Sequence, residues 1–570
     1  MGKETYLDVM ERVIKAYTNQ QLILRKRRNG DYLDIQSYAR LTCVLACLID
    51  GGRMANRQEL WEGMMTACCR ELPQVSGSIE SDFAVKDIMM AYTVMKNRVK
   101  QARLEEWRRD LIAMDPFKQY QYVIGKLQDE SKLHNINIYS MAGEYLRERE
   151  GMTDTEAYFA EHWPIQLKRF DKNGMYRDPG CPMLYDVTTR CQIMLMLHYG
   201  YRGSFYEVLD RHLRKAGQIG LYMQSATFEG PYGGRSNQYL FHEALMTACG
   251  EFEARRYEEE GNPELAGMHK RSAKLALESV QRWMDADPPH HIRNGYSVDS
   301  GWGTEGYGYY DKYMITMGSF LALAYLFASD SAVPERPCPA ETGGYVAQTS
   351  PYFHKLFASA GGYSLQIDTN GDPQYDATGL GRIHRYGVPS ELCLSVPLSS
   401  GDGYKVGEGV GRLQGCLSPG WQKPSGEVQY LSQLGEGLRN ELQVLREEQD
   451  DVAFQVTYSG SCMEGCEAVR LVYHVGPKGV TIDTELIHPT TQAVYTSVPL
   501  LVTNGQDTAT IDCEPGLVRV RLGDSLYQAS FNGEIVISEE AYGNRNGEYK
   551  LAQVRTEEMS TSMVIKLLKA

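Results

Sequence analysis

Apolar residues recur at three- and four-residue spacing from about residue 4 to about residue 330, in segments of roughly 12 to 22 residues. This spacing gathers apolar side chains on one face of a helix, and it predicts about eleven or twelve helices. Turns with Gly, Pro, Asp or Asn, such as those at Asn29 and Gly261, separate the segments. The clearest segments are Tyr6 to Tyr17, Ile35 to Leu48, Phe83 to Ile112, Ile138 to Leu146, Cys191 to Tyr199, Phe205 to Leu221, Leu240 to Tyr257, Leu265 to Trp283 and Tyr313 to Phe327.

Consecutive helices joined by short connections become antiparallel neighbours, so the segments predict stacked helical hairpins. A solenoid and a closed toroid both satisfy this arrangement. The sequence has no fixed-period repeat of the tetratricopeptide or ankyrin kind, which favours the toroid.

The pattern changes after about residue 335 to two-residue alternation and glycine-rich turns. Val469 to Val475 alternates, Pro477 begins a turn, and Val480 to Leu486 alternates again, which predicts a hairpin. Many strands without helices between them indicate an antiparallel sandwich. We therefore predict an (α/α) toroid over residues 1–335 and an antiparallel β-sandwich over residues 336–570, docked against the mouth of the toroid.

Composition narrows the class of protein. With 42% hydrophobic and 23% charged residues, the chain should fold without a partner. The net charge of −14, with one dense basic run at Arg25 to Arg28, disfavours nucleic acid. The N-terminus lacks a signal-like apolar core and no stretch reaches ~18 apolar residues, so we expect no membrane role. The 13 cysteines lack zinc-binding spacing; we expect reduced thiols, a cytoplasmic protein and no metal.

Three polar stretches stand out, and the first surrounds two glycines near Tyr232. Ser236 or Asn237 is placed to cap the helix that follows. Arg235, Asn237 and His242 gather at this helix entrance, where the positive end of the helix dipole suits an anionic ligand. The alternative is a turn and a cap with no ligand.

The second stretch contains His291 and, after it, a glycine-rich segment from Trp302 that includes Tyr309 and Tyr310. Aromatic faces with nearby hydroxyls are common platforms for sugar rings. The alternative is a tyrosine-rich helix start packed in the core, because a buried tyrosine needs only one hydroxyl partner.

The third stretch runs from Thr378 to Gly387, where Arg382 and Arg385 flank His384. We expect a glycine-bounded loop, and loops on a rigid scaffold are where function concentrates. The alternative is a basic surface loop.

Together these features resemble the toroid polysaccharide lyases of the heparinase II/III and alginate lyase kind, including the type that acts on rhamnose-capped glucuronate. The shared features are helical hairpins, an asparagine at a helix entrance, a tyrosine cluster and a histidine in the β domain. The segment from His134, which contains Asn137, and the segment from Asp171 to Tyr185 are also similar to hairpins of this superfamily. Several such lyases have His directly after Asn, whereas this chain has Gln238 there and His242 one helical turn on.

The resemblance implies a carbon–oxygen lyase that cleaves a uronic-acid-containing oligosaccharide or polysaccharide by β-elimination, without a cofactor. The C5 proton of a uronate leaves only when the adjacent carboxylate is neutralised. We assign that role to Asn237, and expect it to face the cleft that holds the acid and base. The candidates for base and acid are His242, His384, Tyr309 and Tyr310, with His384 reaching in from the β domain. The expected substrate-binding residues are Arg235, Tyr232, Trp302, His291, Asn137, Arg382 and Arg385.

Two other functions remain open from the sequence. A glycoside hydrolase on the same toroid would need paired carboxylates across the cleft. A non-catalytic sugar-binding protein would bind the same ligands without turnover. The carboxylates available to a hydrolase are Asp186, Glu243, Glu305 and Asp311.

Overall fold

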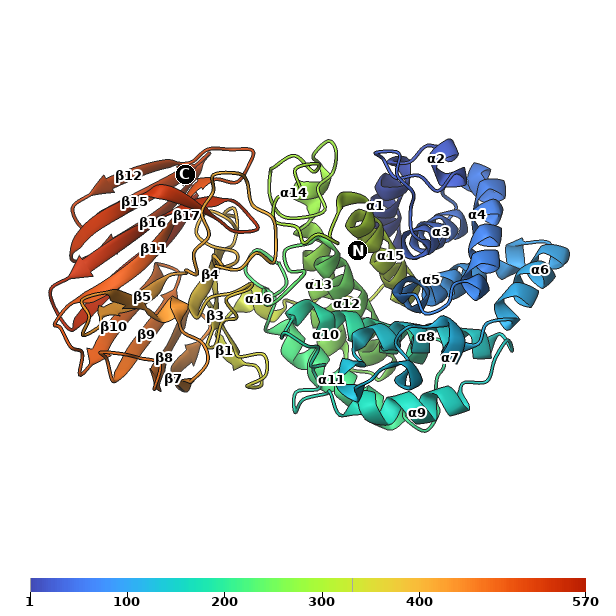
Figure 1. The fold of residues 1–570 in the computed structure, drawn as a ribbon, viewed down its shortest axis with the longest axis horizontal. Helices are drawn as coiled ribbons and strands as arrows, with labels where there is room; N and C mark the ends of the chain where they lie inside the picture. Colours follow the sequence, from blue (N-terminus) through green and yellow to red (C-terminus); the bar gives the residue numbers. More distant parts are fainter. Residues whose placement is uncertain (1, 331, 570) are drawn as a thin grey trace.

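The computed structural model describes residues 2–330 and 332–569, with helices in the first part of the chain and strands in the second (Figure 1). None of the helices in these two ranges is long and apolar enough to cross a membrane. The helices are α1 Lys3–Lys15, α2 Asn19–Ile23, α3 Ile35–Asp50, α4 Gln58–Glu71, α5 Ile79–Met95, α6 Gln101–Ile112, α7 Pro116–Gln119, α8 Asn135–Arg149, α9 Glu156–Leu167, α10 Met183–His198, α11 Tyr206–Leu221, α12 Phe241–Glu259, α13 Pro263–Glu278, α14 Gln281–Met284, α15 Tyr310–Phe327 and α16 Pro339–Thr342.

The inner helices form a closed ring. Going round it, α3, α5, α8, α10, α12 and α15 each pack against the next, and α15 packs back against α3. Other helices lie outside: α1 against α3 and α15, α4 against α3, α11 against α10 and α12, and α13 against α12. Inner and outer helices thus alternate along the chain, which is the (α/α) toroid predicted from the sequence.

Side-chain burial explains this division. In α3 every residue except Asp50 is buried, as expected of a helix surrounded by others. In contrast, α1 and α11 bury one face and expose the other. One detail of the prediction was wrong: the single segment Phe83 to Ile112 is two helices, because the chain turns at Lys96–Arg98 and is extended at Val99.

Three antiparallel sheets follow within the described residues, with strand orders β1-β2-β3-β4, β12-β13-β14-β17-β10-β9-β8-β7 and β15-β16-β11-β5-β6. The predicted hairpin is β9–β10, with Gly476 opposite Gly479. The strands are β1 Tyr345–Gln348, β2 Lys355–Ala360, β3 Tyr363–Asp368, β4 Gly379–Arg385, β5 Ser418–Gln422, β6 Val428–Tyr430, β7 Leu438–Glu448, β8 Asp451–Gly460, β9 Ala468–Gly476, β10 Gly479–Ile487, β11 Val494–Thr503, β12 Thr510–Glu514, β13 Leu517–Leu522, β14 Ser525–Phe531, β15 Glu534–Gly543, β16 Glu548–Thr556 and β17 Ser560–Lys569.

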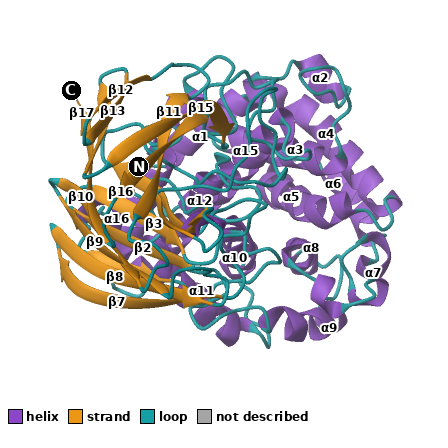
Figure 2. Cartoon of the chain, turned by 60° about the vertical axis from the view of Figure 1, so that its left-hand side comes forward, coloured by secondary structure: helices purple, strands orange, loops and turns teal. Residues whose placement is uncertain are grey.

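The larger two sheets form a sandwich whose shared core includes Leu471 of β9 and Leu500 of β11. The sheet β1–β4 lies between this sandwich and the helices (Figure 2). Successive residues of β2 face opposite ways, since Leu356 belongs to the sandwich core and Phe357 packs with Met175 of the helical part. Every residue of β2 and β3 is therefore buried.

This inner sheet corrects the expectation for the third polar stretch. Gly379–Arg385 is strand β4, not a loop, and it is buried except at Arg385. The predicted division of the chain after residue 335 stays a prediction; it falls in the connection between α15 and β1.

Candidate functional site

The segment before α12 has an unusual backbone. Ser236 and Gln238 are buried non-glycine residues with φ of 60° and 69°, in the left-handed region that side chains disfavour. Such strain persists where the surroundings fix the conformation, and it concentrates at functional sites. Here the N–H of Ser236 donates to Glu305 Oε1 at 2.5 Å and that of Gly234 to Asp376 Oδ2 at 2.8 Å. The segment is thus held from both parts of the molecule.

This backbone presents three hydroxyl groups to one another. Ser236 Oγ lies 3.0 Å from Tyr185 Oη and 3.1 Å from Tyr307 Oη. The Arg235 guanidinium stands 4.7 Å from the centre of the Tyr185 ring. Tyr307 is 42% exposed, so the group is accessible to a ligand. We call Tyr185, Arg235, Ser236 and Tyr307 the hydroxyl cluster.

Asp178 joins the cluster to a histidine. This carboxylate is fully buried; it pairs with Arg235, and its Oδ1 lies 3.8 Å from His134 Nδ1. The His134 ring packs edge-on to Tyr122 at 4.7 Å and is partly exposed. Burial lowers the pKa of His134 although Asp178 opposes the effect, so the imidazole is neutral at neutral pH.

The pKa of Tyr307 is raised by burial, by the neighbouring Tyr185 and by Glu305. Tyr307 therefore keeps its proton at neutral pH. A partly exposed, protonated phenol beside a guanidinium can donate a proton to a departing oxygen, and a neutral imidazole can accept one.

Asn237, within the strained segment, and His242, in the first turn of α12, are both buried. Asn237 is 1% exposed and its Nδ2 donates to Gly234 O at 2.6 Å. Within the described ranges its Oδ1 has no partner. The ring of His242 is buried, and burial followed by the Arg293 charge lowers its pKa to about 3. Neither Ser236 nor Asn237 caps α12, which begins at Phe241 without a side-chain cap.

Tyr309 and Tyr310 point toward the N-terminal part of the chain. Tyr309 Oη donates to Asp34 Oδ2 at 3.1 Å, and the Tyr310 ring lies under Arg28 and against His291. The predicted partnership of Asn237 with these two tyrosines stays a prediction. Their neighbour Tyr307 hydrogen-bonds to Ser236 in the segment before α12.

His384 faces the helical part but has no route to solvent. It is 0% exposed, with Nδ1 at 2.7 Å from Thr227 Oγ1 and Nε2 at 2.9 Å from Ser395 Oγ. Burial and then the Arg382 guanidinium lower its pKa to about 3. Arg382 itself donates to Gly230 O at 2.7 Å. We call Glu229, Arg293, Arg382, His384 and Ser395 the histidine network.

The other candidates from the sequence hold the structure together. Trp302 Nε1 donates to Asn544 O at 3.0 Å, and Asn137 Nδ2 donates to Tyr158 Oη at 3.0 Å. His291 Nε2 lies 3.2 Å from Gly308 O. Tyr232 is fully buried against β4, and Arg385 bonds to Leu567 O. Of the predicted residues, the accessible cluster contains Arg235.

Sequence reasoning did not select Tyr185, Tyr307 or His134 for the site, although it singled out all three segments. One signal was available for Tyr307: it stands between Gly306 and Gly308, ahead of the helix start, and so remains in a loop. Tyr309 and Tyr310 belong to the helix start, where the helix fixes their directions.

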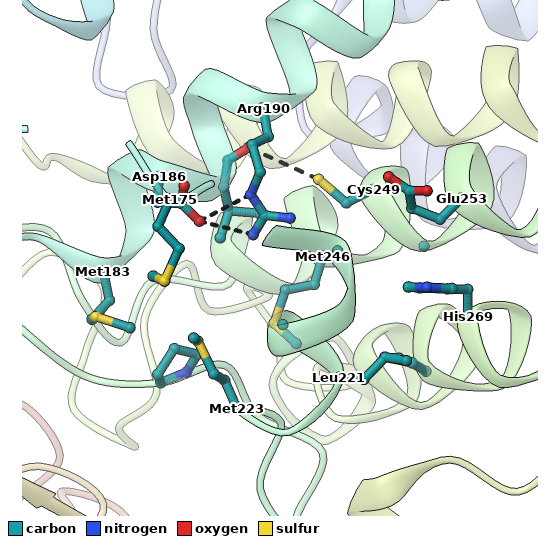
Figure 3. A pocket seen from close by; sticks show the side chains of 16 residues that line it. Met175, Met183, Asp186, Arg190, Leu221, Met223, Met246, Cys249, Glu253 and His269 are labelled. Carbon is teal, nitrogen blue, oxygen red and sulfur yellow. Dashed lines mark hydrogen bonds and ion pairs between the residues drawn. The ribbon is translucent and has the colours of Figure 1, made fainter. Parts of the chain in front are cut away.

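Two cavities lie near these residues. The larger, about 770 Å³, opens between the helical and β parts and is bordered by Glu305, Tyr309 and Tyr310. The smaller, about 50 Å³, is shown in Figure 3; methionines and the bonded pair Asp186–Arg190 line it. A water molecule occupies about 30 Å³ of liquid, so this second space is too small for a sugar ring.

The carboxylates that a hydrolase would need already have partners. Asp186 pairs with Arg190, Glu243 with Arg293, and Glu305 with Arg545. Asp311 accepts from Tyr17 Oη at 2.7 Å. All four are buried.

The comparisons with known proteins concern the fold. No protein-family model and no curated protein matches the chain. Heparinase III is a similar solved structure, at 10% identity and a TM-score of 0.44 over 86% of this chain and 69% of that one. The Streptomyces coelicolor A3 chondroitin AC lyase, solved with chondroitin sulphate, has 8% identity and a TM-score of 0.48 over 99% and 79%. A glycosyl hydrolase of family 88 from Bacteroides vulgatus has 10% identity and a TM-score of 0.37 over 57% and 99%.

Heparinase III and a chondroitin AC lyase, proteins of the kind expected from the sequence, are thus among the solved structures to which this chain is similar. At such low sequence identities, the similarity to these structures concerns the arrangement of helices and strands. The chemistry has to be argued from its own side chains.

Proposed function

We propose that the protein is a carbon–oxygen lyase that cleaves a uronic-acid-containing saccharide by β-elimination at the hydroxyl cluster. The observation that carries this proposal is that Arg235 links phenol groups to a neutral imidazole. Its guanidinium lies over Tyr185, which shares Ser236 with Tyr307, and its partner Asp178 lies 3.8 Å from His134.

In the proposed reaction Arg235, shared between Asp178 and the uronate carboxylate, stabilises the charge that builds on that carboxylate, which makes the C5 proton acidic enough to remove. His134 accepts that proton, and the electron pair of the C5–H bond forms the C4=C5 double bond. The C4–O bond breaks, and Tyr307 donates its proton to the departing oxygen. The role of Asn237 as the neutralising group stays a prediction; it requires its amide to leave Gly234 O.

The test is to incubate the protein with uronate oligosaccharides and record ultraviolet absorbance and new reducing ends. β-Elimination produces both in equal amounts, because each cleavage leaves one unsaturated uronate. Reducing ends without absorbance would establish a hydrolase instead, and binding without either product would establish a sugar-binding protein. The sugar, including the rhamnose-capped glucuronate type, and the cytoplasmic location stay predictions.

The proposal also predicts a pH dependence. The base must be neutral to accept a proton, and burial lowers the pKa of His134 below its ordinary value of about 6.5. The acid limb of kcat/KM should therefore lie below pH 6.5, with activity rising as the pH increases through that limb. A limb above pH 7 that persists in His134→Gln would assign the base to another residue.

A further inference from the structure

The larger cavity contains two arginines that the proposed chemistry does not use. Arg27 and Arg28 stand at the tip of a hairpin in which Lys26 pairs with Tyr32. The Arg27 guanidinium lies 4.0 Å from the centre of the Tyr309 ring, and that of Arg28 lies 4.4 Å from the centre of the Tyr310 ring. Consecutive arginines are thus stacked on consecutive tyrosines at the edge of the cavity.

These guanidinium groups have little of their charge compensated. Arg27 lies 3.9 Å from Asp31, whose carboxylate is 65% exposed. Within residues 2–330 and 332–569 no carboxylate lies within ion-pair distance of the Arg28 guanidinium; only the Arg28 backbone N–H bonds to Asp311, at 3.0 Å. Asp311 is held in turn by Tyr17. The backbone of Arg28 is therefore fixed while its side chain keeps its donors available.

Two more cations come from the β part, on the other side of the cavity. Lys405 Nζ donates to Ser300 O at 2.7 Å, and Arg412 donates to Gly401 O at 2.6 Å. Both contacts are to neutral carbonyl groups. The hydrogen bond from Gln374 and then the Arg412 charge lower the pKa of the exposed Asp402, so Arg412 and Asp402 partly compensate each other. The carboxylates at the cavity edge are Asp299, Glu305, Asp311 and Asp402. Arg545 neutralises Glu305, and Tyr17 and the Arg28 backbone N–H donate to Asp311.

We propose that this cavity binds an anionic group, carboxylate or sulfate, on a sugar unit beyond the one that is cleaved. A guanidinium stacked on an aromatic ring is preorganised for an oxyanion, because it loses little freedom on binding. The cavity of about 770 Å³ has room for a sugar unit. It also contains Glu305, which holds Ser236 of the hydroxyl cluster, so one saccharide can span both places. The inference rests on the proposed function and extends it to saccharides with at least two anionic groups.

The experiment measures binding by calorimetry, which does not require turnover. The probes are a chondroitin sulfate tetrasaccharide, its chemically desulfated form and a neutral xylotetraose, each titrated into the full chain. We expect both anionic probes to bind more tightly than xylotetraose, and to bind less tightly as salt increases. Binding of the sulfated probe alone would restrict the site to sulfate, whereas equal affinity for all three would overturn the proposal.

The variants are Arg28→Gln and Lys405→Gln, which remove one charge from each side of the cavity. Each should weaken binding of the anionic probes roughly tenfold, the effect of losing one charge-assisted hydrogen bond. Lys26→Gln is the matched control, because Lys26 stacks on the exposed Tyr32 and does not border the cavity. Unchanged affinity in both variants would overturn the inference. If the protein shows no elimination but its affinity still depends on the charge of the probe, the proposed function is contradicted and the inference about the cavity stands.

Discussion

The hydroxyl cluster and the histidine network both lie near the junction between the helical and β parts, and both contain arginine and serine side chains. The cluster reaches solvent through Tyr307, which is 42% exposed. The network is enclosed: Arg382 and His384 are 1% and 0% exposed, and both bond across the junction. The difference teaches that polar residues with shifted pKa values can have a structural role as well as a catalytic one. Access of a ligand to the residues distinguishes the two roles.

The largest effect should come from removing the phenol of the cluster. Tyr307→Phe keeps the ring but loses the proposed proton donor, so turnover should fall by about 10²–10⁴. The measurement is the rate of ultraviolet absorbance increase on a uronate substrate, with the melting temperature as a check on folding. Tyr386→Phe is the matched control, because Tyr386 is 67% exposed and lies outside both groups. Full activity in Tyr307→Phe would remove the cluster from the mechanism.

The opposite result is expected in the network. His384→Ala would leave the buried hydroxyl of Ser395 and the half-buried hydroxyl of Thr227 without their imidazole partner, at a cost of about 1–3 kcal/mol of unfolding free energy. Urea unfolding should show this loss, while kcat per folded molecule changes little. A collapse of kcat at unchanged stability would instead make His384 catalytic, as the sequence suggested, and would end the distinction drawn here.

A smaller effect should appear when pH is varied. In the folded chain the pKa values of His242, His269 and His384 are about 3, below the ordinary value of about 6.5. Between these values the unfolded chain binds more protons, so the free energy of unfolding should fall as pH drops below 6.5. Urea unfolding at pH 7.5, 6 and 5 measures the slope. The slope should be shallower in a His384→Asn variant.

The outer helices and the β9–β10 hairpin could be predicted because each buries one face in a regular period. The inner sheet was not predicted. β2 is covered on both sides and shows no alternation of polar and apolar residues, whereas β3 alternates but buries its polar side chains as well. In β4 the bounding glycines and the charges of Arg382 and Arg385 were typical of a loop, yet both arginines find hydrogen-bond acceptors in the structure, Gly230 O and Leu567 O.

The site was harder to predict for a different reason. The choice among the tyrosines depends on where α15 begins. Tyr307 lies before the helix and faces Ser236, whereas Tyr310 is the first residue of the helix and packs under Arg28. Helix boundaries are uncertain by a residue or two from sequence alone. The left-handed backbone of Ser236 and Gln238 depends on contacts with Glu305 and the β part, so the local sequence does not predict it.

The closure of the helical ring constrains how the chain can be made. α15 covers one side of α3, where Gly318 approaches Val44, and it also packs on α1. During synthesis the apolar surfaces of the first helices therefore stay uncovered until almost the whole helical part has left the ribosome. Contacts between such distant parts of a chain form slowly, and uncovered apolar surface promotes aggregation. In a fragment that stops before Tyr310 that surface would stay uncovered, so closure of the ring requires the chain through α15.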